Sequence, residues 1–509
     1  MRAPFSVTLL LSLLLLPAPS PAAGPPAEVW TSVRTKHFLL VGSAGAKDLR
    51  ELAARLEQFR EVCARLLDER HFDDTVPATV VVFRDDESYK PFKPLYKGRP
   101  MEAVSGHFQG SPEGDYLVLS VERRRGNRAR EIAQHEYVHL LVKNSFRDAP
   151  LWFNEGLAEY YSTLRTSDGG QRVAIGRAAP AHALALKGRE LLPLKTLFAV
   201  ERESEHYNED GTRPFFYAQS WALVHFLLTA RRAELSRYLE LLASGSETES
   251  AFLEAFKTDY AALENELKAY VRQGLYAEQE FRFEKNLGRE TEMTIAPLSP
   301  AEARAVAGDL LLHGGRPEEA EPHLRRALAL DPNLARAHAS LGLLRVRQDK
   351  LAEAREHLAR AVEADPQSYH ARYLRAYALS REGADAHRWV TDYDPEAAEL
   401  MRSELRKAVE LAPHFVEAYR LHAFVNLVRG ERLDESVALL KRALEIAPRR
   451  RELALLLAQV HLSREEFAEA RRVLGPLADG SAVGATAGER AQARARSSTR
   501  SRGHSSTSS

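Results

Sequence analysis

The segment HEYVH, residues 135–139, holds two histidines four residues apart. On a helix this spacing puts both imidazoles on one face, about one turn apart, where they can bind a single zinc ion. Glu136 lies between them and can act as general base on a zinc-bound water. The residue types and their spacing therefore point to a metal site with a built-in base.

A second segment, NEGLAE at residues 154–159, follows His139 after a gap of fifteen residues. Pro150 precedes it, which suits the first turn of a helix. Either Glu155 or Glu159 can supply a third, anionic ligand. Three protein ligands plus one water is the layout of a catalytic zinc site, so we expect catalysis rather than a structural metal.

Strand and helix patterns surround the two motifs. Short apolar and β-branched runs predict strands at residues 37–41, 79–83 and 116–120. Amphipathic patterns predict one helix between the first two strands, helices across both motifs, and further helices up to residue 282. Residues 27–282 are therefore expected to form an α+β domain with strands early and helices late.

From about residue 300 the chain repeats itself. Asp331 and Asp365, each followed by proline, are 34 residues apart, and Gly308 and Gly342 occupy one column of the repeat. Small residues at fixed positions let paired helices approach closely. This pattern closely resembles the tetratricopeptide repeat. We expect about five helix pairs over residues 300–479, forming an all-α solenoid.

The remaining segments are predicted as connections and ends. Residues 283–299 show weak periodicity and finish in Pro-Leu-Ser-Pro, which suits a linker. Residues 1–23 combine Arg2, an apolar run and small residues at a cleavage position, as a signal peptide does; an uncleaved anchor is the alternative. Residues 480–509 are rich in Ala and Gly, then Ser and Arg, and are expected to be disordered. We therefore expect a secreted or periplasmic protein with no transmembrane segment after signal cleavage.

Composition narrows the class of partner. The chain has 509 residues, and its 71 Lys+Arg balance 71 Asp+Glu, which argues against nucleic acid as the main partner. The only cysteine is Cys63, so neither an intramolecular disulfide nor a cysteine-based zinc site can form.

The two motifs together resemble the gluzincin metallopeptidases. Residues 29–282 resemble, more narrowly, the peptidase MA-like domains that are often fused to tetratricopeptide repeats; the matching pieces are HEYVHLL, PLWFNEGLAEYY, LLPLKTLF and FFYAQSWALVHFL, in that order. The resemblance implies a zincin-like fold and one Zn²⁺ per chain, held by His135, His139 and Glu155, with Glu136 as base.

The third ligand has two candidates within this resemblance. The Asn-Glu-Gly context favours Glu155, as in the aminopeptidase N segment. The gap of nineteen residues between His139 and Glu159 matches thermolysin better. If Glu155 is the ligand, Glu159 lies one turn further on and can orient a ligand histidine.

Tyr217 is the candidate donor to an oxyanion, a role that tyrosines fill in related enzymes. An aromatic core residue at a helix start is the alternative reading. His225 is expected to pack rather than to act in catalysis. The paired carboxylates do not suit glycoside hydrolysis, because neighbours on one helix turn cannot flank a sugar.

Two functions are compatible with these features. The first is an exported zinc peptidase whose repeats dock a peptide or protein substrate, or a protein partner. The second is an exported repeat scaffold in which the metallopeptidase-like domain is structural or inactive.

Overall fold

The computed structural model describes residues 29–67, 76–121, 128–145, 149–243, 245–284, 287, 292–383, 390–448 and 450–478. The expected signal peptide and the expected disordered tail lie outside these residues. Within the described ranges, no helix is both long enough and apolar enough to cross a membrane.

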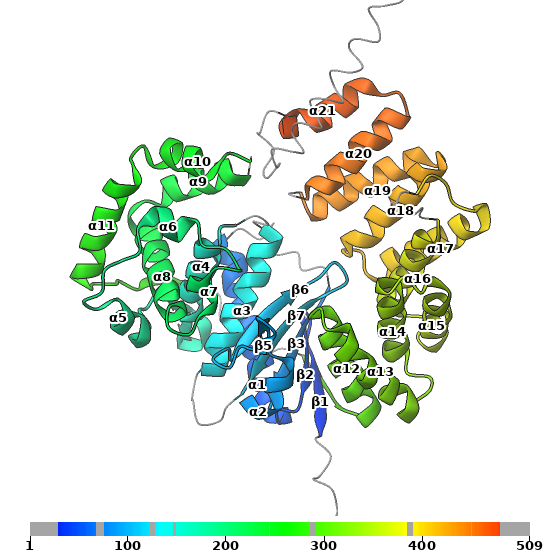
Figure 1. The fold of residues 1–509 in the computed structure, drawn as a ribbon, viewed down its shortest axis with the longest axis horizontal. Coiled ribbons are helices and arrows are strands. Elements are labelled where there is room, and N and C mark those ends of the chain that lie inside the picture. The colour runs from blue at the N-terminus through cyan, green and yellow to red at the C-terminus, as the bar shows by residue number, and fades with distance from the viewer. Residues whose placement is uncertain are drawn as a thin grey trace, which may run out of the picture.

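A six-stranded sheet lies between two groups of helices (Figure 1), and its strand order is β11-β1-β2-β3-β7-β6. The strands are β1 (Trp30–Arg34), β2 (Phe38–Gly42), β3 (Ala78–Phe83), β6 (Gly106–Gly110), β7 (Asp115–Ser120) and β11 (Thr294–Leu298). The central strands β2, β3 and β7 run parallel, whereas β1, β6 and β11 pair antiparallel with their neighbours. The three strands predicted from the sequence are thus the parallel centre of the sheet.

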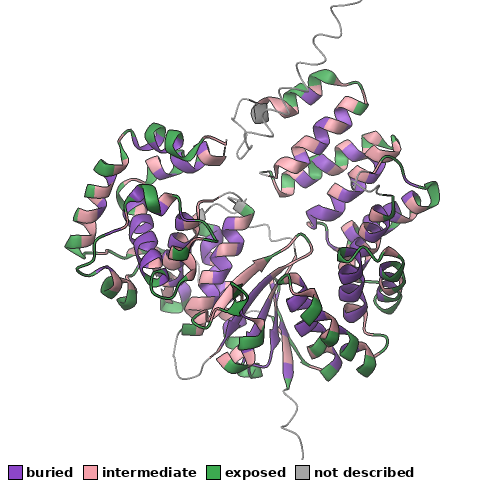
Figure 2. Cartoon of the chain, viewed as in Figure 1, coloured by how far each residue is buried: buried purple, intermediate pink, exposed green. Residues whose placement is uncertain are grey.

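Helices cover both faces of this sheet, so most residues of its central strands are buried (Figure 2). Helices α1 (Ala46–Leu67) and α3 (Arg128–Ser145) lie on one face, over Val80 and Val82 of β3. Helix α12 (Pro300–His313) lies on the other face, over Val81. This two-sided burial explains why β3 is almost continuously apolar.

The predicted linker is wrong at residues 294–298, which form β11 and pair with β1 from Trp30↔Leu298 to Arg34↔Thr294. Pro297 weakens the strand pattern in the sequence, because proline cannot donate to a ladder. An edge strand tolerates such a residue. The segment before the repeats is therefore part of the sheet.

The remainder of the N-terminal part is mostly helical. Its longer helices are α4 (Leu151–Ser162), α8 (Arg213–Ala230), α9 (Arg232–Ala243), α10 (Thr248–Phe256) and α11 (Tyr260–Gln273). Its short helices are α2 (Asp86–Tyr89), α5 (Pro180–Leu186), α6 (Leu194–Phe198) and α7 (Glu205–Asn208). The small sheets are β4 (Leu95–Tyr96) with β5 (Arg99–Pro100), and β8 (Arg165–Ser167), β9 (Arg172–Ile175) and β10 (Gln279–Arg282). The expected α+β architecture is present.

The C-terminal part is a curved stack of helix pairs (Figure 1). In the described residues its ten helices are α12, α13 (Pro317–Leu330), α14 (Ala335–Arg347), α15 (Leu351–Ala364), α16 (Tyr369–Glu382), α17 (Pro395–Leu411), α18 (Val416–Arg429), α19 (Leu433–Ile446), α20 (Arg451–Ser463) and α21 (Phe467–Ala478). A Cβ at Gly308 would lie 2.7 Å from the Leu324 side chain, and one at Gly342 would lie 2.4 Å from Leu358. The repeated small residues therefore sit where paired helices touch, as predicted.

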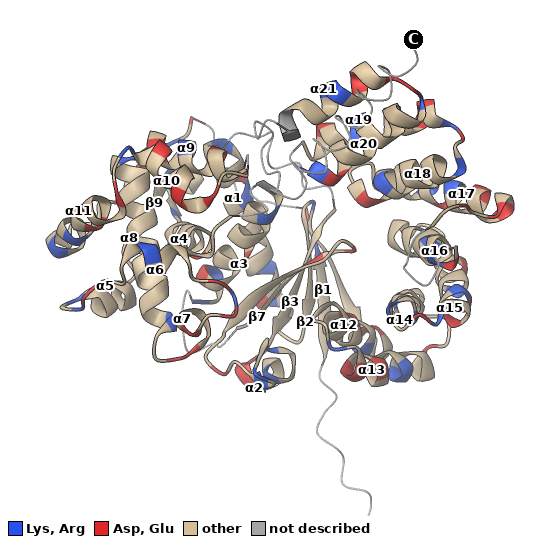
Figure 3. Ribbon diagram, turned by 45° about the horizontal axis from the view of Figure 1, so that its top comes forward, with Lys and Arg blue, Asp and Glu red and all other residues tan. Residues whose placement is uncertain are grey.

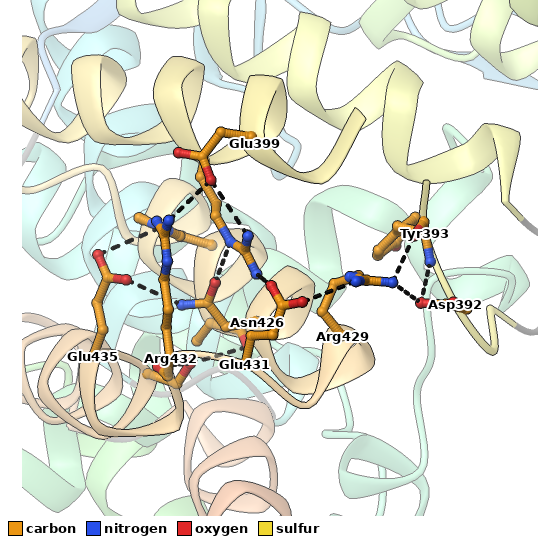
Figure 4. Close-up of polar contacts among 12 residues, drawn as sticks. Asp392, Tyr393, Glu399, Asn426, Arg429, Glu431, Arg432 and Glu435 are labelled. Atoms are coloured by element: carbon orange, nitrogen blue, oxygen red, sulfur yellow. Dashed lines mark hydrogen bonds and ion pairs between the residues drawn. The ribbon is translucent and has the colours of Figure 1, made fainter. Parts of the chain in front are cut away.

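A buried arginine joins two repeats near the C-terminal end of the stack. Arg402 is 3% exposed, and its guanidinium donates to Asn426 Oδ1 at 2.7 Å and to Glu431 at 2.9 Å. Arg429 extends this network to Asp392 at 2.7 Å (Figure 4). The segment that precedes α17 is thereby tied to the following helix pair.

Candidate metal centre

Helix α3 places the first three candidate residues. The rings of His135 and His139 lie 4.7 Å apart between centroids and nearly perpendicular, on the face that meets α4. Glu136 is 6% exposed. A Cβ at Gly106 would lie 2.3 Å from the Ile132 side chain, so glycine lets edge strand β6 approach α3 closely. The base candidate is therefore buried between its helix and the edge of the sheet.

Helix α4 brings the carboxylates of the second motif to the histidines. Its position is fixed by Gly156, where a Cβ would lie 2.3 Å from the Ser220 carbonyl oxygen of α8. Only glycine permits this approach without a shift of one helix. Glu155, the neighbouring residue, is 2% exposed and is turned toward α3. In the Asn-Glu-Gly sequence, two polar residues are thus followed directly by the glycine that lets α4 pack closely on α8.

His135, His139 and Glu155 have potential ligand atoms that all lie within 4.8 Å of one another. Glu155 Oε2 lies 3.3 Å from His135 Nε2 and 3.5 Å from His139 Nε2. This buried oxygen has no hydrogen-bond partner among the described residues. A buried carboxylate oxygen without a partner is costly, and a bound cation would satisfy it. The residues therefore fit a zinc ion by donor type and by arrangement.

Both histidines are held through the nitrogen that faces away from this centre. His139 Nδ1 lies 2.9 Å from Asn154 Oδ1. His135 Nδ1 lies 3.4 Å from Glu159 Oε1. A proton on Nδ1 leaves the lone pair on Nε2, the tautomer that binds a metal from this side. In this geometry Glu155 faces the two Nε2 atoms, and Glu159 contacts His135 from the other side of its ring.

Charge at the site favours a cation. Burial alone disfavours every charged form, but His182 and His135 outweigh it at Glu159 and lower the pKa of that carboxyl to about 2. At His135, Glu155 and Glu159 likewise outweigh burial and raise the imidazole pKa to about 10. At His139 burial prevails, and the neighbouring His135 also keeps its pKa below the usual value. The two carboxylates therefore stabilise positive charge at this site.

Glu136 behaves differently from the other carboxylates. Burial raises its pKa to about 8, and the charges of Glu155 and Glu159 add to this effect while His135 opposes it. A cation held by the ligand set would favour its ionised form.

Tyr217, the predicted oxyanion donor, lies beside the centre. Its ring stacks on His135 at 6.2 Å between centroids, and burial raises its pKa well above the usual value. A neutral phenol is a hydrogen-bond donor. His225, by contrast, is fully buried in the core and its Nδ1 lies 2.6 Å from the Tyr270 hydroxyl. Its position agrees with a packing role.

The sequence reading missed two residues that support the ligands. His182 on α5 lies 2.8 Å from Glu159 Oε2. Tyr207 on α7 donates to Glu155 Oε1 at 3.1 Å. Neither belongs to a recognisable motif, since each reaches the centre only through the tertiary fold.

Two family models match this chain. Residues 131–247 match a family described as a protein of unknown function (DUF1570), and this segment runs from α3 into the loop after α9. It includes every residue of the candidate centre. Residues 311–380 and 427–481 match the tetratricopeptide repeat. No curated protein sequence matches the chain.

Solved structures with some likeness to the chain include the following three. YrrB, a tetratricopeptide-repeat protein with an unusual peptide-binding site, is 19% identical, with 39% of this chain and 92% of YrrB covered and a TM-score of 0.32. PilF of Pseudomonas aeruginosa is 19% identical, with 41% and 93% covered and a TM-score of 0.32. MamA of Desulfovibrio magneticus RS-1 is 16% identical, with 36% and 96% covered and a TM-score of 0.31. On the family model, the C-terminal part of the chain is built from tetratricopeptide repeats, a class whose concave surfaces bind other proteins.

Proposed function

We propose that this protein is an exported zinc-dependent peptidase of the gluzincin type. The observation that carries the proposal is the convergence of His135 Nε2, His139 Nε2 and Glu155 Oε2 beside the buried carboxyl of Glu136. Zinc at this position would act as a Lewis acid toward water and a scissile carbonyl.

The chain's own residues would then divide the work of hydrolysis. Glu136, ionised beside a cation, accepts a proton from the attacking water and passes it to the leaving amine. Tyr217 keeps its phenolic proton and donates a hydrogen bond to the oxyanion that develops on the carbonyl. Strand β6 lies alongside α3 at one end of the strand order, and its outer edge can hold an extended peptide by strand addition.

The repeats would dock the substrate protein or a partner. Lys and Arg are interspersed with Asp and Glu over the repeat helices (Figure 3), and many form ion pairs such as Arg372–Glu404 and Arg345–Glu321. A mixed surface of this kind suits a protein partner better than a uniformly charged polymer.

Glu136→Gln tests the peptidase proposal. The variant should retain about one zinc per chain by elemental analysis and lose peptide cleavage by about 10²–10⁴-fold, because only the proton acceptor is removed. Cleavage would be found by profiling the peptides released from a proteome by the wild type and by the variant. Wild-type protein that folds but contains no zinc would refute the proposal.

The second candidate is a repeat scaffold with an inactive metal domain, which the repeat match favours. Because α12 covers the sheet, the repeats are best tested within the full chain. A Glu136→Gln protein that supports every wild-type phenotype would favour the scaffold.

A further inference from the structure

Tyr207 belongs to a short segment that is separate from both zinc motifs. Helix α7 spans Glu205–Asn208. Two side chains donate hydrogen bonds to carbonyl oxygens of this segment: Asn208 Nδ2 to Ser204 at 2.9 Å and Thr212 Oγ1 to Glu205 at 2.9 Å. The segment therefore has its own local hydrogen bonds and does not depend on the metal site for its shape.

Aromatic contacts fix the direction of the Tyr207 ring. It stacks on Tyr217 with centroids 6.1 Å apart and planes 14° apart, and it meets Phe216 edge-on at 6.1 Å. Both partners lie in the first turns of α8. Packing against two rings leaves the phenol few rotamers, so its hydroxyl is held at one place.

The Tyr207 hydroxyl is held beside one oxygen of the Glu155 carboxylate. The Tyr207 hydroxyl donates to Glu155 Oε1 at 3.1 Å, whereas Oε2 faces both histidine Nε2 atoms at 3.3 and 3.5 Å. The two carboxylate oxygens thus have different environments. Burial and the nearby Glu155 charge raise the pKa of Tyr207 above its usual range, so the phenol remains a donor.

We propose that Tyr207 is a positioning residue that holds Glu155 as a one-oxygen metal ligand. Its hydrogen bond fixes the carboxylate plane and occupies Oε1, which leaves Oε2 alone for the cation. Without the hydroxyl, Oε1 is a buried acceptor without this donor, and the carboxylate can turn both oxygens toward the metal. The inference rests on the metal site of the proposed function, but it does not require that peptides be cleaved.

The test compares metal binding by Tyr207→Phe and by the wild type in the full-length protein. Phenylalanine keeps the stacked ring and removes only the hydroxyl group, which also hydrogen-bonds to Tyr217. We expect zinc affinity, measured by competition with a chromogenic chelator, to fall about 10–100-fold, as when other partners of metal ligands are removed. The visible absorption of the Co²⁺-loaded variant should weaken and shift, because a second carboxylate oxygen raises the coordination number.

Tyr160→Phe is the matched control. It also removes a buried hydroxyl from this part of the fold, but Tyr160 lies against a cavity of about 80 Å³ lined by Leu66 and Phe281, and its hydroxyl has no partner among the described residues. It should keep the wild-type zinc affinity and cobalt spectrum. Tyr207→Leu separates packing from hydrogen bonding, since it removes the ring as well.

Three outcomes decide the matter. If Tyr207→Phe loses affinity and changes the cobalt spectrum while Tyr160→Phe does not, the inference stands, even if no peptide is cleaved. If Tyr207→Phe binds zinc like the wild type, the inference fails and the peptidase proposal is untouched. If the folded wild type binds neither Zn²⁺ nor Co²⁺, both fail together.

Discussion

His182 Nε2 lies 2.8 Å from Glu159 Oε2, and through this contact α5 reaches the candidate metal centre. The other oxygen of Glu159 lies 3.4 Å from His135 Nδ1. One carboxylate therefore joins two imidazoles, of which only His135 faces the candidate ligand position. This arrangement separates the role of Glu159 from that of Glu155.

Replacing His182 by alanine should weaken metal binding without abolishing it. Glu159 would lose one of its two imidazole partners and hold His135 less firmly, so zinc affinity should fall about tenfold. Chelator competition measures the effect, and His323→Ala in the repeats serves as control. An increase in affinity would contradict the assignment, because it would mean that the released Glu159 had joined the ligands.

Gly156→Ala should disturb the packing of α4 on α8. The new methyl group would meet the Ser220 carbonyl at 2.3 Å, and backbone atoms cannot move aside cheaply. We expect a loss of about 1–3 kcal/mol in unfolding free energy, with weaker zinc binding, measured by urea denaturation and chelator competition. Gly475→Ala in α21 is the control, since among the described residues no atom beyond its own stretch of helix lies within 4 Å of its Cβ position. It should be neutral or stabilising by up to about 1 kcal/mol. Equal effects at the two sites would contradict the packing argument.

Asp309→Asn should show a pH-dependent effect at the contact between sheet and repeats. Asp309 accepts hydrogen bonds from Tyr116 and Ser340, and although burial opposes ionisation, His313, Arg336 and these bonds hold its pKa below the usual value. A depressed pKa means that the ionised group stabilises the fold above the unfolded pKa of about 3.9, and that this stability is lost as pH falls through the lower folded pKa.

The variant should therefore be less stable than the wild type by about 1–3 kcal/mol at pH 7, and the difference should shrink below about pH 4. Urea midpoints of both proteins at pH 7 and pH 3, in the presence of a metal chelator, give the comparison. A difference that is the same at both pH values would show that the charge of Asp309 does not matter.

Local spacing was enough to predict the pieces of the site that lie on one helix. His135, Glu136 and His139 share a helix face because of the 3.6-residue turn, and the repeats could be read because each copy uses the same small residues at helix contacts. The choice between Glu155 and Glu159 was different. It depends on how α4 lies against α3, and that is set by Gly156 against α8, a contact between residues 64 positions apart.

The remaining parts of the site and the sheet depend on contacts that no local pattern records. His182 and Tyr207 lie in short helices whose sequences carry no ligand spacing, and they meet the centre only after α5 and α7 pack on α8. Strand β11 escaped the sequence reading because Pro297 interrupts its pattern and because its stability comes from pairing with β1.

The coverage of the sheet by α12 has a consequence for the order of assembly. During synthesis from the N-terminus, residues 30–120 are made long before Thr294–Leu298 and α12. Until α12 is made, the sheet face that holds Val41, Val81 and Val118 is not covered by it. The sheet that supports α3 can reach its final packing only after residue 313 has emerged. A holding chaperone would protect this half-covered intermediate from aggregation until the first repeat has been made.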